Sequence, residues 1–125
     1  MILSQGMRNR FASHINFAFL RGFIQANPNV MPSNIDMVLE RKGKFLFGEW
    51  KRPGENMNLG QEILLQKLAK IHTVLIITGD TDNGVNVTNI QQMCPFGKLV
   101  NKGGTAEDLK KVLNDWYIDA DKTEK

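Results

Sequence analysis

The sequence has a single cysteine, Cys94, among its 125 residues. One cysteine excludes an internal disulfide and a cysteine-based metal cluster, and both exclusions suit a reducing compartment. We interpret Cys94 as a small apolar side chain that is buried or half-buried.

Long hydrophobic runs are absent as well. The longest apolar stretches, FLFG and TVLIITG, are far shorter than the roughly 20 residues that a membrane-spanning helix requires. The first residues also lack a basic segment followed by an apolar one, which is the pattern of a secretory leader. We therefore expect a cytoplasmic protein without a membrane partner.

Negative charge is missing from the first 31 positions. The chain has 16 Lys and Arg against 13 Asp and Glu, a net charge of +3, and the excess of basic charge lies in the first half. Most acidic residues outside the stretch 32–54 lie from Glu107 onward instead. This distribution permits a polyanion as partner, although it does not prove one.

No internal repeat or low-complexity segment is found, and 125 residues suffice for one domain but not for two. We predict a single domain over residues 1–125, frayed over about its last six residues. The helical spacing of apolar residues predicts a first helix from about Leu3 to Gln25, which the prolines of ANPNVMPSN end.

Two β-rich runs, 35–40 and 45–51, flank the basic turn RKGK, and Gly43 in this turn favours an antiparallel hairpin. The later patterns predict a helix from Leu59 to about Ile71, a buried strand from Thr73, a weaker strand from Val85 to Met93, and a helix opened by Thr105 and Asp108 that runs to about Tyr117. This order predicts an α/β fold, in which helices flank a central mixed sheet.

Charged residues gather at one end of the predicted hairpin. Alternate residues of a strand share a face, so Glu49 and Lys51 point to the same side. Asp36 lies thirteen positions before Glu49, at the start of the first strand. Antiparallel pairing brings that start beside the end of the second strand. Two carboxylates and one amine are therefore predicted to converge.

Such a group has the parts needed for phosphodiester hydrolysis. Asp36 and Glu49 would bind Mg²⁺, a hard cation that takes oxygen ligands, and Mn²⁺ would substitute for it. Lys51 would orient a water molecule or stabilise developing negative charge. An ordinary cross-strand salt bridge remains the alternative, because Glu-x-Lys is a short pattern that also occurs by chance, as at Glu40 to Lys42.

The stretch SNIDMVLERKGKFLFGEWK resembles the PD-(D/E)XK nuclease superfamily, in which an aspartate on one strand and an acidic-x-lysine on the next form a metal site. The following residues, EWKRPGENMNLGQEILLQKLAK, look like its small VRR-Nuc and Holliday-junction-resolvase branch, where a glutamine begins the next helix. The resemblance implies a restriction-endonuclease-like core of α-β-β-β-α-β type. It also implies a catalytic set of Asp36, Glu49, Lys51 and Gln61, with the backbone carbonyl of Trp50 as a further metal ligand.

One departure from the family concerns the first helix, where many members place a glutamate that also serves the metal site. No residue from Met1 to Met31 is acidic here. His14 is the substitute candidate, although a lone histidine at such a position is more often structural. The number of bound metals, and a weakened or degenerate site, therefore stay open.

The sequence thus favours a phage-type, metal-dependent DNA endonuclease for branched or structured DNA, located in the host cytoplasm if it is virus-encoded. We expect a homodimer, because one such site cuts one strand. The residues expected to contact DNA are Arg8, Arg10, Arg21, Lys44 and Arg52. Two alternatives remain: a non-catalytic nucleic-acid-binding protein with a degenerate nuclease fold, and a nuclease-fold component of a larger complex.

Overall fold

The computed structural model describes residues 17–22, 24–29 and 35–122. The chain divides into two compact units, Met1–Pro32 and Ser33–Lys125. In the first unit the only helix described is the short 3-10 helix η2 (Phe17–Leu20). After it the backbone turns, and the N–H of Gly22 donates to the carbonyl of Pro28 at 3.0 Å. The helix expected to reach Gln25 therefore ends at Leu20, where its last described turn is 3-10, and its earlier part lies outside the described residues.

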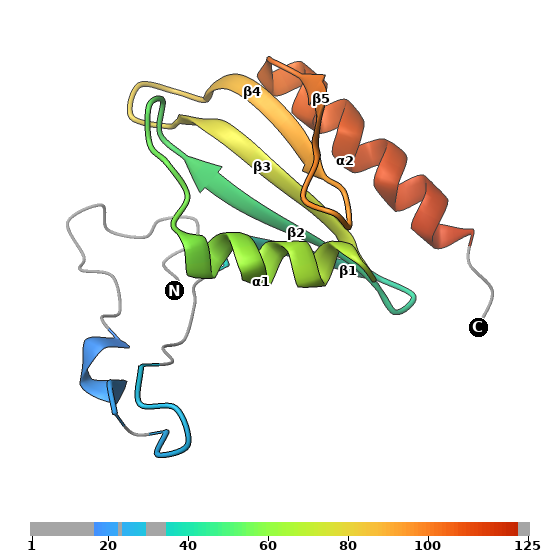
Figure 1. Ribbon diagram of the computed structural model, residues 1–125. Coiled ribbons are helices and arrows are strands. Elements are labelled where there is room, and N and C mark those ends of the chain that lie inside the picture. Colours follow the sequence, from blue (N-terminus) through green and yellow to red (C-terminus); the bar gives the residue numbers. More distant parts are fainter. Residues whose placement is uncertain (1–16, 23, 30–34, 123–125) are drawn as a thin grey trace, which may run out of the picture. The chain divides into compact units, whose positions relative to one another are not determined.

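The second unit contains a five-stranded mixed sheet and two helices (Figure 1). Its strands follow the spatial order β1-β2-β3-β4-β5; only β2 and β3 are parallel, and the other neighbours are antiparallel. The expected α/β fold with a central mixed sheet is confirmed. In chain order the elements are β1 (Met37–Arg41), β2 (Lys44–Lys51), α1 (Leu59–Ala69), β3 (Thr73–Asp80), β4 (Asn86–Met93), β5 (Leu99–Gly103) and α2 (Ala106–Asp121).

The hairpin of β1 and β2 forms as predicted. Its register pairs Met37 with Gly48 at one end and Arg41 with Lys44 at the other. Lys42 and Gly43 form the turn with φ of 52° and 83°. Two left-handed residues in a two-residue turn match the right-handed twist of the strands that they join, which explains the tight connection.

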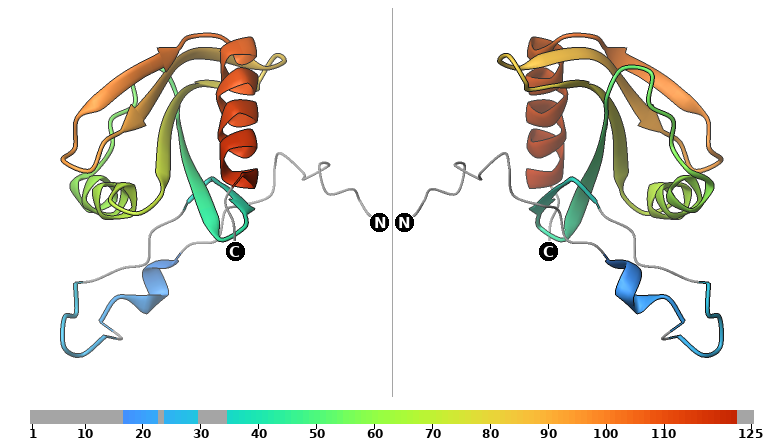
Figure 2. Two further views of the ribbon diagram at one scale, coloured as in Figure 1. Left: turned by 90° about the vertical axis from the view of Figure 1, so that its right-hand side faces the viewer. Right: turned by 90° about the vertical axis from the view of Figure 1, so that its left-hand side faces the viewer.

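The two helices cover opposite faces of the sheet (Figure 2). Because side chains alternate along a strand, β3 sends Leu75 and Ile77 to the α2 face and Val74 and Ile76 to the α1 face, and all four are buried. The α2 face is completed by Leu46, Val87, Ile90 and Leu109, and the α1 face by Leu65, Ala69 and Met93.

The structure corrects the boundaries at the C-terminal end. Strand β5 was not predicted; its residues are mostly exposed, so they lack the alternation that marks a half-buried strand. Helix α2 continues past Tyr117 to Asp121, and Ala120 is buried, so the frayed end expected from about residue 120 is wrong for these residues.

The described order differs from the core that the resemblance implied. Two strands precede α1, whereas an α-β-β-β-α-β core has three strands before its second helix. The additional strands β4 and β5 instead follow β3. None of the helices in the described ranges has the length and apolarity to cross a membrane.

Candidate active site

Asp36 lies directly before β1, and its carboxylate reaches the end of β2. Its Oδ2 accepts a hydrogen bond from the backbone N–H of Trp50 at 2.9 Å. The pairing of β1 with β2 ends at Met37 and Gly48. Beyond this pair, the Asp36 side chain accepts the backbone N–H of Trp50 in place of a strand partner. The N–H and C=O of one strand residue point to the same side. The Trp50 carbonyl is therefore directed to the sheet edge that Asp36 occupies.

Gln61 connects Glu49 and Lys51 on the α1 face of β2. Lys51 Nζ donates to Gln61 Oε1 at 2.7 Å, and Gln61 Nε2 donates to Glu49 Oε2 at 2.5 Å. The Lys51 ammonium also lies 3.6 Å from Glu49 Oε2. Glu49 is 5% exposed and Lys51 is 9% exposed. The carboxylate, the ammonium and the amide thus form one group, in which both charged residues are buried.

Asn58 sets the position of Gln61. It is the N-cap of α1, and its side-chain oxygen accepts the backbone N–H of Gln61 at 2.8 Å. This bond fixes the first turn of the helix and with it the residue that faces β2. Sequence reasoning missed Asn58. The available signal was an Asn three positions before a Gln at a helix start, which is a variant of the capping box.

The surroundings of Glu49 disfavour its charged form. Burial raises the pKa of its carboxyl, and the nearby charge of Asp36 raises it further, while Lys51 and Gln61 act in the opposite direction. Its Oε1 is the only buried side-chain oxygen or nitrogen without a hydrogen-bond partner in the part of the chain that the structure describes. A buried polar atom of this kind is costly unless something binds it.

The donors at this position suit a hard cation. Asp36, Glu49 and the Trp50 carbonyl offer oxygen atoms alone, and Mg²⁺ is commonly held by one or two carboxylates while it keeps several waters. The described residues contain no group of three or more His, Cys, Asp or Glu able to hold a metal. The set is therefore two carboxylates and one carbonyl, and His14, the candidate for a further ligand, lies outside the described residues.

An open cleft of about 530 Å³ adjoins this group. Arg52 lies at the cleft and binds Asp82 through two contacts, Nη1 to Oδ2 at 2.8 Å and Nη2 to Oδ1 at 3.3 Å. The hydrogen bond that the Arg52 guanidinium donates to the Asp82 carboxylate raises the pKa of Arg52. The residues lining the cleft are Asp36, Trp50, Lys51, Arg52, Glu55, Gly79, Asp80 and Thr81.

The structure does not bring all the predicted DNA-binding residues together. Arg52 is at the cleft. Lys44 begins β2 and Lys51 ends it, so about 23 Å of extended strand separates Lys44 from the site. Arg21 is an exposed turn residue of the first unit. Arg8 and Arg10 lie outside the described residues.

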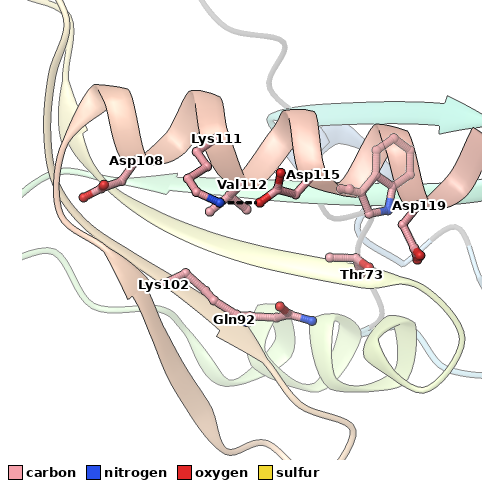
Figure 3. A pocket seen from close by; sticks show the side chains of 9 residues that line it. Thr73, Gln92, Lys102, Asp108, Lys111, Val112, Asp115 and Asp119 are labelled. Atoms are coloured by element: carbon pink, nitrogen blue, oxygen red, sulfur yellow. Dashed lines mark hydrogen bonds and ion pairs between the residues drawn. The ribbon is translucent and has the colours of Figure 1, made fainter.

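A second groove, of about 440 Å³, lies between α2 and the sheet (Figure 3). Helix α2 contributes the acidic residues Asp108, Asp115 and Asp119 to this groove. The opposite side is formed by Thr73, Gln92 and Lys102, from three strands. Asp115 forms an ion pair with Lys111 at 2.8 Å. This groove contains no buried carboxylate oxygen without a partner, in contrast to Glu49. The site at Asp36, Glu49 and Lys51, at the end of β2 away from the hairpin turn, is therefore the better candidate for an active site.

The fold brings the four predicted catalytic residues together at one end of the sheet. Asp36, Glu49, Lys51 and Gln61 come from the start of β1, the end of β2 and the first turn of α1. Comparison of the chain with known protein families, with curated proteins and with solved structures found no match.

Proposed function

We propose that the chain is a metal-dependent endonuclease that hydrolyses phosphodiester bonds in branched or structured DNA. The observation that carries the proposal is the buried carboxylate of Glu49, which has one unpartnered oxygen and is linked through Gln61 to Lys51. Asp36 lies at the same end of the hairpin, on the N–H of Trp50. The resemblance to the PD-(D/E)XK superfamily, in its small VRR-Nuc and Holliday-junction-resolvase branch, supports the same assignment.

In this proposal Asp36, Glu49 and the Trp50 carbonyl hold Mg²⁺, and Mn²⁺ substitutes for it. When bound, the cation supplies positive charge at the scissile phosphate and acidifies a water molecule. Lys51 directs its remaining N–H donors at the attacking water or at the charge that develops on phosphate. Gln61 holds the ammonium in this direction, because its Oε1 occupies one of the three Lys51 donors.

Arg52 is the proposed phosphate-binding residue. Its guanidinium already engages two carboxylate oxygens of Asp82 in the described structure, and a backbone phosphate offers the same pair of acceptors to that fork. Cleavage of both strands of a duplex needs two such sites, so the active form in this proposal is a homodimer.

One observation favours a second function, in which the protein binds nucleic acid without cutting it. Only two carboxylates converge at the site within the described ranges. Such a site would hold a metal weakly.

A cleavage assay decides between the two functions. The purified chain is incubated with supercoiled plasmid and with an end-labelled four-way junction, in Mg²⁺, Mn²⁺ or EDTA, beside a Glu49→Gln variant. We expect cleavage in either metal, none in EDTA and none by the variant. DNA binding without cleavage in both metals would establish the second function.

A further inference from the structure

Phe96 is the most exposed large hydrophobic side chain in the described part of the chain, at 94%. It lies in the turn between β4 and β5. Two backbone hydrogen bonds close this turn, from Cys94 N–H to the Lys98 carbonyl and from Gly97 N–H to the Cys94 carbonyl, each at 2.8 Å. An aromatic ring is thus presented to solvent on a well-defined turn.

The turn packs against α1, as both Figure 1 and Figure 2 show. A Cβ atom added at Gly97 would lie 2.7 Å from Nε2 of Gln66, so the backbone of the turn touches the middle of the helix. Gln66 follows Gln61 by five residues, or about 7.5 Å along the helix axis. Across β3, Gln92 of β4 is level with Gly48 of β2, so the turn lies two strands away from β2 and toward its Lys44 end. A DNA strand that crosses the candidate site along α1 would therefore meet the turn several nucleotides away from the site.

Two lysines come from the turn and from the part of α1 that it contacts. Lys98 belongs to the same turn, and Lys67 is the neighbour of Gln66 on α1. Neither ammonium forms an ion pair with any residue that the structure describes. Proteins bind single-stranded nucleic acids with two components, exposed aromatic rings and cationic side chains. The rings stack on the bases, and the cations contact the phosphates.

We propose that the turn between β4 and β5 is a stacking platform for an unpaired base in the DNA strand that reaches the candidate site. Phe96 stacks on the base, while Lys67 and Lys98 contact the backbone phosphates. This inference rests on the proposed function and narrows its substrate class to DNA with unpaired bases, such as branch points, flaps and single strands. A fully paired duplex offers no base for the ring.

A protein partner fits the turn less well. A phenylalanine side chain contributes roughly 150–250 Å², whereas a stable protein interface buries about 800 Å² on each partner. A single base is matched in size to one ring, and the adjacent unpaired lysines favour an anionic ligand.

Fluorescence anisotropy in EDTA tests the platform without cleavage. The probes are a labelled duplex, the same duplex with a three-nucleotide single-stranded flap, and the free single strand. Phe96→Ala is expected to weaken binding of the flap and the single strand about tenfold, within the range for one stacked base, and to change duplex binding less than twofold. Phe96→Trp is expected to bind all three probes at least as well as the parent.

Ile71→Ala is the matched control, because Ile71 is 78% exposed and lies beyond the end of α1. It should leave all three affinities unchanged. An equal loss on duplex and flap for Phe96→Ala, no loss at all, or no DNA binding by the parent would overturn the inference. The two proposals fail separately: flap-selective binding without metal-dependent cleavage refutes the endonuclease alone, and cleavage with an unaltered Phe96→Ala profile refutes the platform alone.

Discussion

Gln61 Nε2 donates a hydrogen bond to Glu49 Oε2 at 2.5 Å, although the two residues lie twelve positions apart, on α1 and at the end of β2. The contact exists because Asn58 fixes the first helical turn and because α1 packs on the face of the sheet to which Glu49 points. The same amide accepts from Lys51. The acidic-x-lysine pattern alone is too short to identify a site. In the structure, Glu49 and Lys51 of this pattern are buried, and Gln61 orients both side chains.

Glu49→Gln and Asp36→Asn are expected to abolish cleavage and to weaken metal binding. A ligand that binds only the folded state raises its stability, so Mg²⁺ should raise the melting temperature of the parent and not that of either variant. Thermal unfolding with and without Mg²⁺ measures this effect independently of activity. Asp115→Asn serves as the control, because Asp115 is exposed and paired with Lys111 on α2. An equal Mg²⁺ shift in parent and Glu49→Gln would exclude Glu49 as a ligand.

Lys51→Ala is expected to lower turnover by on the order of a hundredfold, the scale of a lost electrostatic stabiliser, with a smaller effect on DNA binding. Single-turnover kinetics beside a binding titration separates the two effects. Lys42 is unsuitable as a control, because its ammonium donates to the Asp121 carbonyl at 2.8 Å. Lys102→Ala is suitable, since Lys102 is exposed and lines the groove under α2. Turnover that is nearly the same in both variants would contradict the role of Lys51.

Arg52 and Asp82 are expected to affect DNA binding in opposite directions. Arg52→Gln removes a phosphate contact, so affinity should fall and the slope of log affinity against log salt should decrease by about one. Asp82→Asn removes the carboxylate that Arg52 now binds, so affinity should rise. Titrations of labelled DNA at several salt concentrations give both quantities. A fall in affinity for both variants would mean that the pair acts as a structural unit.

Asp121 should make stability depend on pH. Its hydrogen bond with Arg41 lowers the pKa of the carboxyl in the folded state. The stabilisation is therefore present above the unfolded pKa, near 4, and is lost as pH falls through the folded value. Asp121→Asn should melt below the parent at pH 7, with a difference that shrinks below about pH 4. Thermal unfolding of both proteins at pH 7 and at pH 3 measures this difference, and equal melting temperatures at pH 7 would contradict the role of the pair of Arg41 and Asp121.

Much of the fold was predictable because its signals are local. The turn RKGK and its flanking β-rich runs specify the hairpin, and the hairpin alone sets Asp36 beside the end of β2. Strand β3 follows from a compact apolar run. Helix α1 forms where it was predicted, but Leu59 and Ile63 of the predicted apolar period are exposed, and Leu65 and Ala69 are the buried residues. These patterns need no knowledge of distant residues.

The sequence alone determined the α/β class, the hairpin and the candidate group of Asp36, Glu49 and Lys51. Only the tertiary structure decided that Glu49 and Lys51 are buried, that Gln61 bridges them, and that Lys44 lies far from the site. Strand β5 likewise exists because its backbone pairs with β4. Local spacing fixes which way a side chain points along its own element. Burial, pairing partners and pKa depend on which other element packs on that side, and no short stretch of sequence contains this information.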